Sequence, residues 1–420
     1  MNQDNTRIIS EGMASRLLPL GYELLPGVSE VYELELAYLE SRLLNKEEIL
    51  RNGAYFTCVD NRYTQHYLMC KGEPIKLPQY SSSRLKSFFQ INQFKTGYAT
   101  HGLFPYRGKF HPQMIKALIN IMGLKRGDLI LDPMMGSGTT LIEARLMGVR
   151  SIGIDTSPFC RFMTQVKLDG LTIPLETIKN AINDFKVIYN CFALKNESKL
   201  PEDYSPPSIY NFLLLAYLDS VGYSERSQKK SHLEQFKAII ERYVFVVEKI
   251  QQSIIGTENE LAEAVAIEGD ARCLTMDDHS IDGILFSPPY SFAIDYLKND
   301  SYHLSYLGVD IKQLQEKMVG LHGHTFREKF DLYLKDMKTI LAECSRVLRK
   351  GKFCTVIIGT NENQLSKILK KPVEKIKGLD EIIIELGNLF GLKLVRKIER
   401  QITGIANTMR TESILLLQKD

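Results

Sequence analysis

Four stretches of the chain combine residue types that suit a charged or aromatic ligand at the end of a strand. The first, LDPMMGSGTT, places Gly136 and Gly138 between a short apolar run and a helical pattern. Glycine allows positive φ and a close approach of the backbone to a ligand. The N-terminus of the helix that follows offers free N–H groups to an anion. Asp132 at the strand end suits an ammonium group and Thr139 suits a helix cap, although a purely structural turn is the alternative.

Two carboxylates stand at later strand ends. Asp155 ends the apolar run VRSIGID, and Asp270 lies in EGDAR after the run AVAIE. An acidic residue one strand after a glycine turn typically accepts hydrogen bonds from ribose hydroxyls, and the later carboxylate suits an adenine amino group. Each also has a structural interpretation, Asp155 as a helix cap and Asp270 as a turn cap. With the glycine loop, they predict a pocket for an adenosyl group that carries an ammonium-bearing tail.

The tetrapeptide Ser287-Pro288-Pro289-Tyr290 follows the apolar run DGILF. Two prolines fix φ and remove two N–H donors, so rigid carbonyl oxygens remain at the end of a strand. A Ser hydroxyl and a Pro carbonyl accept hydrogen bonds from an amino group, and Tyr290 offers a flat face for stacking. The pattern predicts a site for a planar base with an exocyclic amine. The alternative is a proline-rich loop with a surface tyrosine.

These motifs lie on alternating strands and helices. Residues 128–133 predict a buried strand, 134–148 a glycine turn that opens into a helix, and 149–155 a second buried strand. Strands resume at 264–270, at 282–290 and in KFCTVIIG, while GLKLVRKIERQI and ESILLLQK predict an antiparallel pair. The long helix FDLYLKDMKTILAECSRVLRK is expected to end at Gly351 as its C-terminal cap. The fold class is therefore α/β, with a doubly wound parallel sheet.

The pattern divides the chain into three parts. Residues 1–95 form an N-terminal extension, in which 31–50 has helical spacing. Residues 96–170 and 263–420 carry the alternating pattern and the motifs, and Pro112 begins a helix there. Residues 171–262 interrupt the alternation as a helical insertion, with helices expected in LETIKNAINDFKVIYN, SPPSIYNFLLLAYLDS and HLEQFKAIIERYVFVVEKIQQSI.

Taken together, LDPMMGSGTT and FSPPY resemble the amino-methyltransferases that act on DNA with S-adenosylmethionine. The Ser-Pro-Pro-Tyr form is similar to the N4-cytosine branch of that family. Residues 100–114 look like the segment that lines the methionine end of the cofactor, and 287–308 look like the continuation past the tetrapeptide. The resemblance covers about 96–170 and 264–420, and it implies a Rossmann-like methyltransferase core.

The resemblance also implies a role for each motif residue. Asp132, Gly136 and Gly138 would hold the methionine portion of S-adenosylmethionine, Asp155 the ribose, and Asp270 the adenine. Further cofactor-binding residues implied are Phe110, Pro112, Pro133 and Thr139. The catalytic set would be Ser287, Pro288, Pro289 and Tyr290, with Ser287 and the Pro288 carbonyl on the target amine and Tyr290 stacked on a flipped-out base. No metal ligand is implied.

Three features depart from the family pattern. Met135 stands where an aromatic residue is most common, 171–262 separates Asp155 from Asp270, and 1–95 has no counterpart in the shared core. The alternatives within enzymes are N6-adenine methylation of DNA, amine methylation of RNA such as tRNA, and methylation of protein glutamine. A different class is a catalytically silent DNA-binding protein on a methyltransferase scaffold.

Composition sets wider limits. The 420 residues carry 53 basic and 50 acidic side chains, a net charge of +3, which neither requires nor excludes a nucleic-acid partner. Hydrophobic residues are 44% and charged residues 25%, which excludes wholesale disorder. The 7 Cys form no CxxC pair or zinc spacing, so a reducing, cytoplasmic compartment is expected. No apolar run approaches the ~20 residues of a membrane span.

The expected partner is double-stranded DNA, with a separately encoded restriction endonuclease as a further possible partner. Phosphate contacts need local cations, and the candidates are the 226–230 loop, Arg84 with Lys86, Arg107 with Lys109, and Lys367, Lys370 and Lys371. The insertion 171–262 is the first choice for target recognition, with packing or dimerisation as its alternative. The recognition sequence and the oligomeric state do not follow from the sequence.

Overall fold

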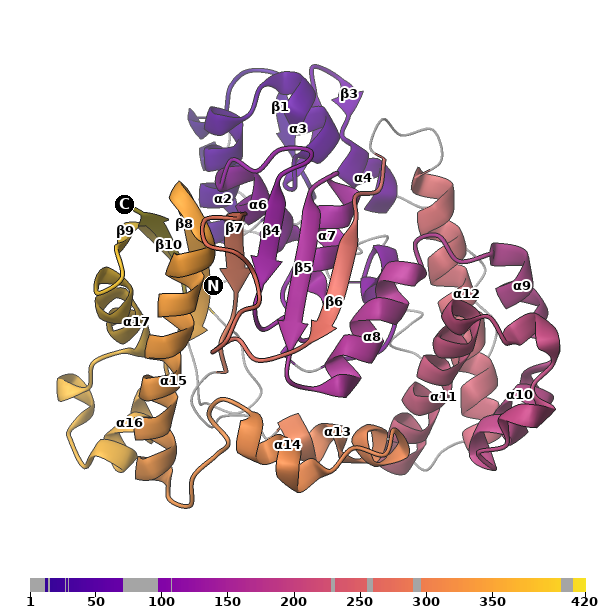
Figure 1. Cartoon of the computed structure of the whole chain (residues 1–420). Helices are drawn as coiled ribbons and strands as arrows, with labels where there is room; N and C mark the ends of the chain where they lie inside the picture. Colours follow the sequence, from indigo (N-terminus) through magenta and orange to yellow (C-terminus); the bar gives the residue numbers. More distant parts are fainter. Residues whose placement is uncertain are drawn as a thin grey trace.

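In the computed structural model, helices cover both faces of a central sheet, and a small three-stranded sheet lies at the top of the view in Figure 1. The structure describes residues 12–13, 16–26, 28, 30–70, 97–106, 108–227, 231–254, 260–289, 296–401 and 411–420. All structural statements below concern these residues.

The central sheet has seven strands in the order β6-β5-β4-β7-β8-β10-β9. Their bounds are β4 (Leu129–Asp132), β5 (Arg150–Asp155), β6 (Ala264–Glu268), β7 (Ile281–Phe286), β8 (Leu348–Gly359), β9 (Leu392–Gln401) and β10 (Thr411–Lys419). Neighbours from β6 to β8 are parallel, whereas β10 runs antiparallel to β8 and β9. The strand order reverses at β4, so the expected doubly wound, Rossmann-like fold is confirmed.

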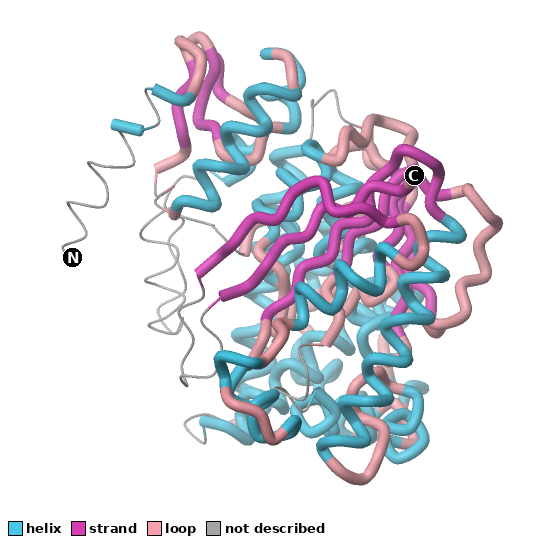
Figure 2. The backbone as a smooth tube through the Cα atoms, turned by 90° about the vertical axis from the view of Figure 1, so that its left-hand side faces the viewer, coloured by secondary structure: helices cyan, strands magenta, loops and turns pink. Residues whose placement is uncertain are grey.

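The strands alternate their apolar side chains between two faces, because successive residues of a strand point to opposite sides. Ile130, Leu285 and Ile357 pack in one cluster with α6 (Pro112–Ile121) and α7 (Thr139–Leu146). Their neighbours Leu131, Ile284 and Val356 pack in another with α15 (Phe326–Val347) and α17 (Leu379–Asn388). Figure 2 shows the sheet as a twisted layer between helices. Burial on both faces explains why the central strands are almost continuously apolar.

The parallel strands β4, β5, β6 and β7 end at one edge of the sheet, at the lower side of Figure 1, near α13 (Tyr296–Tyr306) and α14 (Ile311–Lys317). From β4, the chain adds β5 and β6 on one side and then β7 and β8 on the other, so the direction in which strands are added reverses at β4. Ligands of open α/β sheets bind outside the carboxyl ends of the strands at such a reversal. The fold therefore brings the glycine loop, Asp155, Asp270 and the Ser-Pro-Pro segment to the same edge.

The N-terminal part packs directly on the sheet domain. It contains β1 (Tyr22–Leu24), α2 (Val31–Leu43), α3 (Lys46–Asn52), β2 (Phe56–Val59), β3 (Arg62–Tyr63) and α4 (Gln65–Cys70). The helical stretch expected at 31–50 is two helices, because Asn45 caps α3 in a capping box with Glu48. Tyr32 and Leu36 of α2 share one apolar cluster with Ile130 of β4.

The interval 171–262 is helical where it is described. It contains α9 (Leu175–Asn180), α10 (Phe185–Ala193), the 3-10 turns η2 (Glu197–Lys199) and η3 (Glu202–Tyr204), α11 (Pro207–Ser227) and α12 (His232–Ile254). The single helix expected over 175–190 is broken between α9 and α10. These helices share one core with α8 (Pro158–Asp169) and α13, so the interval packs against these two helices.

One expected helix end is wrong. The helix α15 ends at Val347, and Leu348 already belongs to β8, where it is buried and pairs with Ile281 of β7. Gly351, expected as the helix cap, lies inside the strand with φ of 73°. The helix ends before Leu348 because this residue pairs with β7 and its side chain is buried in the core beneath α15. The remaining elements are η1 (Ala99–Gly102), α16 (Glu362–Leu369) and η4 (Val373–Lys375).

The antiparallel pair expected at the end of the chain is confirmed as β9 and β10. Among the described residues, every helix is too short or too polar to cross a membrane.

Replacing Glu40 with Gln is expected to weaken the pH dependence of stability. Glu40 of α2 is buried and accepts hydrogen bonds from Asn120 Nδ2 at 2.6 Å and from the Ala54 amide at 3.0 Å. Burial raises its pKa from 4.5 to about 7. Its stabilising effect is therefore complete below pH 4.5 and is lost as the pH rises through 7. The loss is at most about 3 kcal/mol.

Urea unfolding at about pH 5 and about pH 8 measures this effect, since the unfolding free energy of the wild type should fall more steeply than that of Glu40→Gln. Glu35→Gln is the matched control, because Glu35 lies on the same helix and pairs with Arg396 at the surface. Equal pH slopes in the wild type and Glu40→Gln would contradict the role of this carboxyl.

Candidate active site

A cavity of about 300 Å³ opens at the carboxyl ends of the parallel strands. Its volume lies within the range of small-molecule sites, about 300–1,000 Å³. Five chain segments that are distant in sequence contribute to its wall, namely 108–110, 133–137, 155–157, 269–271 and 287–289. The cavity therefore unites the glycine loop, both strand-end carboxylates and the Ser-Pro-Pro segment, which the sequence predicts separately.

The glycine loop connects β4 to α7. Gly136 and Gly138 have φ of 49° and 75°, a backbone region that favours glycine. Gly138 is the N-cap of α7, and a Cβ there would lie 2.4 Å from Thr164 Cγ2, so the close packing of α7 on α8 also requires glycine. A Cβ on Gly136 would meet only Tyr106 Cε1 at 3.6 Å. Gly136 and Thr139 line the cavity, whereas Gly138 packs against Thr164 of α8 and is not part of the cavity wall.

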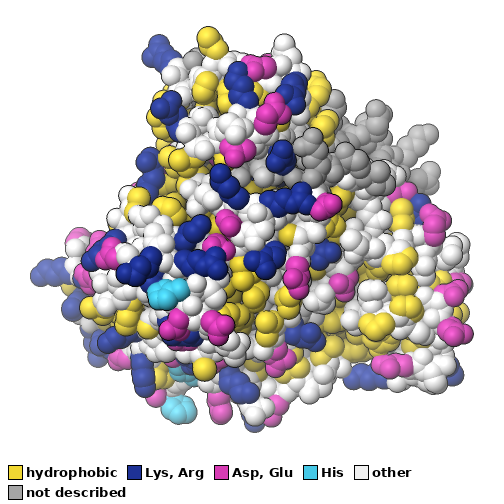
Figure 3. All heavy atoms as spheres, turned by 45° about the horizontal axis from the view of Figure 1, so that its top comes forward, with side chains coloured by type: hydrophobic (Ala, Val, Ile, Leu, Met, Phe, Trp, Pro, Cys, Tyr) yellow, Lys and Arg dark blue, Asp and Glu magenta, His cyan; other side chains and the backbone are white. Residues whose placement is uncertain are grey.

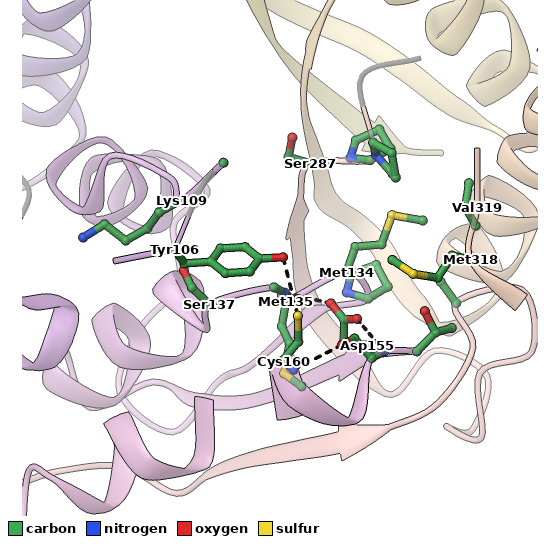
Figure 4. Close-up of a pocket in the computed structure, with 18 of the residues that line it drawn as sticks. Tyr106, Lys109, Met134, Met135, Ser137, Asp155, Cys160, Ser287, Met318 and Val319 are labelled. Atoms are coloured by element: carbon green, nitrogen blue, oxygen red, sulfur yellow. Dashed lines mark hydrogen bonds between the residues drawn. The ribbon is translucent and has the colours of Figure 1, made fainter. Parts of the chain in front are cut away.

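Asp155 holds this loop in place. Its two carboxylate oxygens accept hydrogen bonds from the Gly136 amide at 3.0 Å and the Ser157 amide at 2.9 Å, as the close-up in Figure 4 shows. Burial raises its pKa to about 6, although both hydrogen bonds act in the opposite direction. A carboxylate accepts about four hydrogen bonds, so Asp155 retains capacity for ligand hydroxyls. The helix cap is Ser157, whose hydroxyl accepts from the Cys160 amide, and not Asp155.

Asp270 lines the cavity in a different electrostatic state. The guanidinium of Arg272 donates to both of its carboxylate oxygens, at 2.7 to 3.1 Å, and the Arg272 amide donates at 2.9 Å. Burial acts to raise the pKa of Asp270, but the bonds from Arg272 outweigh it and hold that pKa below its ordinary value. Arg272 also pairs with Asp336, which contacts His322 at 3.1 Å. Asp270 is therefore an anchored anion at the cavity wall.

Ser287, Pro288 and Pro289 follow β7 and line the opposite wall. The strand before them is fully buried along its length, so it fixes where the segment leaves the sheet. Figure 4 shows Ser287 across the cavity from Asp155 and Cys160. Tyr290, the fourth member of the motif, lies outside the described residues.

Phe110 and Pro133 line the cavity as expected, but two other expected contacts lie elsewhere. Asp132 is fully buried beneath the loop, where Oδ1 accepts from the Met134 amide at 3.1 Å, and burial raises its pKa to about 7. Pro112 is the first residue of α6 and packs in the core. Both shape the elements that carry the site and do not reach its wall.

Several wall residues have no counterpart among the predicted site residues. Tyr106 points into the cavity, where its hydroxyl lies 3.5 Å from Cys160 Sγ. Asp300 of α13 lies on the same side and is 9% exposed. Met318 and Val319, which follow α14, supply an apolar surface. Tyr106 and Asp300 fall within the stretches 100–114 and 287–308, which was the only signal that pointed to them.

The donor set suits the cofactor that the family resemblance implies. The cavity offers carboxylates for hydroxyl and cationic groups, loop backbone beside a helix N-terminus, and the apolar side chains of Met134, Met318 and Val319 for a flat ring. The glycine loop is the close-approach backbone that such a ligand needs. The residues present therefore fit S-adenosylmethionine. Among the described residues, no group of three or more His, Cys, Asp or Glu is placed to hold a metal ion.

The helical insertion is tied to the cavity wall by a buried polar chain. The Phe104 amide donates to Tyr243 Oη at 2.9 Å, and Tyr243 Oη donates to Asp219 Oδ2 at 3.2 Å. Arg242 pairs with the same carboxylate. Phe104 has φ of 52°, a strained value for a residue other than glycine. The insertion therefore holds in place the turn that leads to Tyr106.

The cations expected to contact DNA are only partly described. The side chains of 223–230 and residues Arg84, Lys86 and Arg107 lie outside the described residues. Lys109 is not a free surface cation, because its ammonium donates to the His101 carbonyl at 3.0 Å while the side chain lines the cavity. Lys367, Lys370 and Lys371 are exposed. On the face in Figure 3, Lys and Arg side chains are interspersed with Asp and Glu.

Sequence comparison relates the chain to methyltransferases. Residues 50–165 match the family described as DNA methylase, a span that includes the glycine loop and Asp155. The chain is 27% identical over 279 residues to Type II methyltransferase M.BsoBI of Geobacillus stearothermophilus, covering 51% of this chain and 54% of that protein. It is 35% identical over 231 residues to M.MjaII of Methanocaldococcus jannaschii, covering 51% and 42%. The chain thus spans about half the length of these relatives.

A shorter similarity links the chain to a tRNA enzyme. The tRNA (guanine(10)-N2)-dimethyltransferase of Methanothermobacter thermautotrophicus is 50% identical over 52 residues, which are 12% of this chain and 16% of that protein. Among solved structures, a SAM-dependent methyltransferase from Methanosarcina mazei aligns over 72% of this chain and 96% of that one, with a TM-score of 0.34 and 12% identity.

Alanine at Gly138 is expected to destabilise the protein more than alanine at Gly136. Both substitutions place a Cβ at positive φ, which costs about 1–2 kcal/mol. Only at Gly138 does the Cβ collide with Thr164, adding roughly 1–3 kcal/mol of overpacking. Thermal unfolding of the two variants gives the comparison, and equal melting temperatures would contradict the packing argument.

Tyr243 does not line the cavity, but replacing it with Phe is expected to destabilise the turn at Phe104 that positions Tyr106 in the cavity wall. The change leaves the buried Phe104 amide unpaired, which costs about 1–3 kcal/mol. Weaker S-adenosylmethionine binding should accompany the loss of stability, because the turn at Phe104 leads to Tyr106. Calorimetric titration measures the affinity. Tyr204→Phe is the control, since Tyr204 Oη bonds only to Asp184 within the insertion, and an identical affinity loss in both variants would refute the specific link.

Proposed function

We propose that the chain, which is similar to the DNA methylase family over residues 50–165, transfers a methyl group from S-adenosylmethionine to an exocyclic amino group of a base in DNA. The observation that carries the proposal is the convergence of the glycine loop, Asp155 and Ser287–Pro289 on one cavity. The first two suit the cofactor and the third suits an amine, so a methyl donor and its acceptor meet in one place.

Residues of this chain hold the cofactor in the proposal. When bound, S-adenosylmethionine supplies an electrophilic methyl group on a sulfonium. The Asp155 carboxylate accepts from the ribose hydroxyls, and Asp270, fixed by Arg272, stands at the adenine end. The glycine loop and Thr139 flank the amino-acid tail. Met318 and Val319 cover the apolar face of the ring and exclude water.

The Ser-Pro-Pro segment orients the amine. An aromatic amine is a poor nucleophile because its lone pair is delocalised into the ring. The Ser287 hydroxyl and the Pro288 carbonyl would accept hydrogen bonds from the two N–H groups of the amine. This orientation would direct the nitrogen lone pair toward the methyl group. Positioning of this kind supplies much of the rate in a direct transfer. Tyr290, which lies outside the described residues, is assigned to stack on a base that has left the duplex.

We assign the acceptor to N4 of cytosine, because Ser-Pro-Pro-Tyr is the form that resembles the N4 branch. N6 of adenine is the alternative with the same amine chemistry. The short identity to a tRNA dimethyltransferase favours RNA as a second candidate substrate. A catalytically silent DNA-binding protein is the contrasting class, and the presence of both Asp155 and Ser287 on the wall of one cavity argues against it.

The wider role is also a proposal. The names of the relatives, Type II methyltransferases, are consistent with modification of a specific DNA site. We assign to the same role a separately encoded endonuclease as partner and a cytoplasmic location. We assign target recognition to the interval 171–262, and phosphate contacts to the exposed Lys367, Lys370 and Lys371. Its tie to Phe104 adds a structural task to that role.

Ser287→Ala is expected to reduce methyl transfer about 100-fold while cofactor binding stays unchanged, because an orienting acceptor is lost. The assay uses labelled S-adenosylmethionine with DNA from a methylation-free host, followed by nucleoside analysis. N4-methylcytosine is the expected product, and N6-methyladenine would redirect the base assignment. A parallel assay with tRNA tests the second candidate.

The chain supplies its own control, since Ser205 begins a second Ser-Pro-Pro sequence outside the cavity wall. Ser205→Ala should transfer methyl groups at the wild-type rate. Full transfer by Ser287→Ala would refute the assigned site, and no transfer by the wild type to either nucleic acid would favour the silent scaffold.

A further inference from the structure

We propose that the Asp300 carboxylate is a further cofactor-binding group, whose negative charge, added to that of Asp155 at the ribose, recognises the positive charge of the sulfonium. The pair would thereby favour S-adenosylmethionine over the product S-adenosylhomocysteine, whose sulfur is uncharged. The inference rests on the proposed function and deepens it, because it assigns to the same cavity a means of releasing the product.

Asp300 has no side-chain partner among the described residues. This side chain lines the cavity from α13 and is 9% exposed. Within the described part of the chain, its carboxylate makes no hydrogen bond or ion pair. A buried carboxylate without a partner is costly, so a ligand with positive charge in the cavity would stabilise it.

The other carboxylates of the cavity wall are held in ion pairs. Asp270 pairs with Arg272, and Glu412 pairs with Arg400. The Asp155 carboxylate accepts from two backbone amides of the described residues, which carry no net charge. Within the described part of the wall, Asp155 and Asp300 are therefore the carboxylates that lack an ion pair.

The two carboxylates interact electrostatically. Burial, together with the charge of Asp155 on β5, raises the pKa of Asp300 to about 7. Tyr106, in the segment before α6, and Cys160 of α8 also lie near the pair, and both hold their protons because burial raises each pKa well above its ordinary value. Asp132 lies beneath the loop, where burial together with the charge of Asp155 raises its pKa to about 7. Among the other groups packed on α13, α14 adds the buried Leu314 and α11 the Leu218 carbonyl bonded to His303, while the ammonium of Lys195 donates to the Tyr306 carbonyl at the end of the helix.

A cation bound between the carboxylates favours their charged forms. Each unit by which a ligand lowers the pKa of Asp300 makes binding about tenfold tighter above pH 7 than well below it. Affinity for S-adenosylmethionine should therefore rise as the pH increases from about 5.5 to about 8. The product shares every group except the charged sulfur, so the ratio of the two affinities isolates the sulfonium.

Calorimetric titration of both ligands into wild type and Asp300→Asn tests the proposal. We expect the preference for S-adenosylmethionine over S-adenosylhomocysteine to fall about tenfold in the variant, and its rise with pH to flatten. Asp331→Asn is the matched control, because Asp331 is an exposed residue paired with Arg327. An unchanged ratio in Asp300→Asn would overturn the proposal. An equal loss of affinity for both ligands would do the same, since it indicates a hydroxyl acceptor that does not sense charge.

A second measurement needs no variant. Titrations of the wild type near pH 6.5, in two buffers of different ionisation enthalpy, count the protons released on binding. Release with S-adenosylmethionine but not with its product is expected, and equal release with both would overturn the proposal. If neither ligand binds the wild type, the proposed function fails together with this inference. If both bind and only the ratio is unaffected by Asp300→Asn, the inference alone fails.

Discussion

The site depends on the two hydrogen bonds that the Asp155 carboxylate accepts. One comes from the loop after β4 and the other from the first residues before α8, so a single side chain at the end of β5 joins two adjacent strand ends. Without it, the Gly136 amide would have no fixed direction and the loop could not keep its left-handed turn beside the cavity. The carboxylate must be buried to do this, and burial raises its pKa to about 6. The Asp155 carboxylate therefore both holds the glycine loop in place and lines the cavity where a ligand would bind.

Much of the fold follows from the sequence because the central strands are short and apolar on both faces. The runs around Leu131, Ile154 and Ile284 can only be satisfied by a sheet covered on both sides, and their strand ends carry the motif residues. Gly351 shows where local signals fail. Glycine after a helix is a common cap, but the burial of Leu348 outweighs that preference, which only the packed core reveals.

The site was less predictable than the fold for a related reason. Gly136, Asp155, Asp270 and Ser287 stand at strand ends, where order along the chain determines position. Asp300, Met318 and Arg400 reach the same cavity from helices and strands whose placement depends on long-range packing. Asp132 and Pro112 show the converse, since both stand in the expected motifs but lie in the core. A motif thus identifies a neighbourhood, and the contacts of each side chain decide whether it faces a ligand.

The pairing of β4 has a consequence for how the chain is made. Residues 129–132 form the centre of the sheet, yet one of their two neighbours is β7, whose residues 281–286 are synthesised long afterwards. During that interval β4 is an edge strand with unpaired backbone groups and apolar side chains, which is the kind of surface that promotes aggregation. The helices of 171–262 are translated in this same interval, and their contacts are largely local. The helices of 171–262 are therefore complete before β7 is synthesised. They can pack on α8 at that stage, while β4 still lacks its second neighbour.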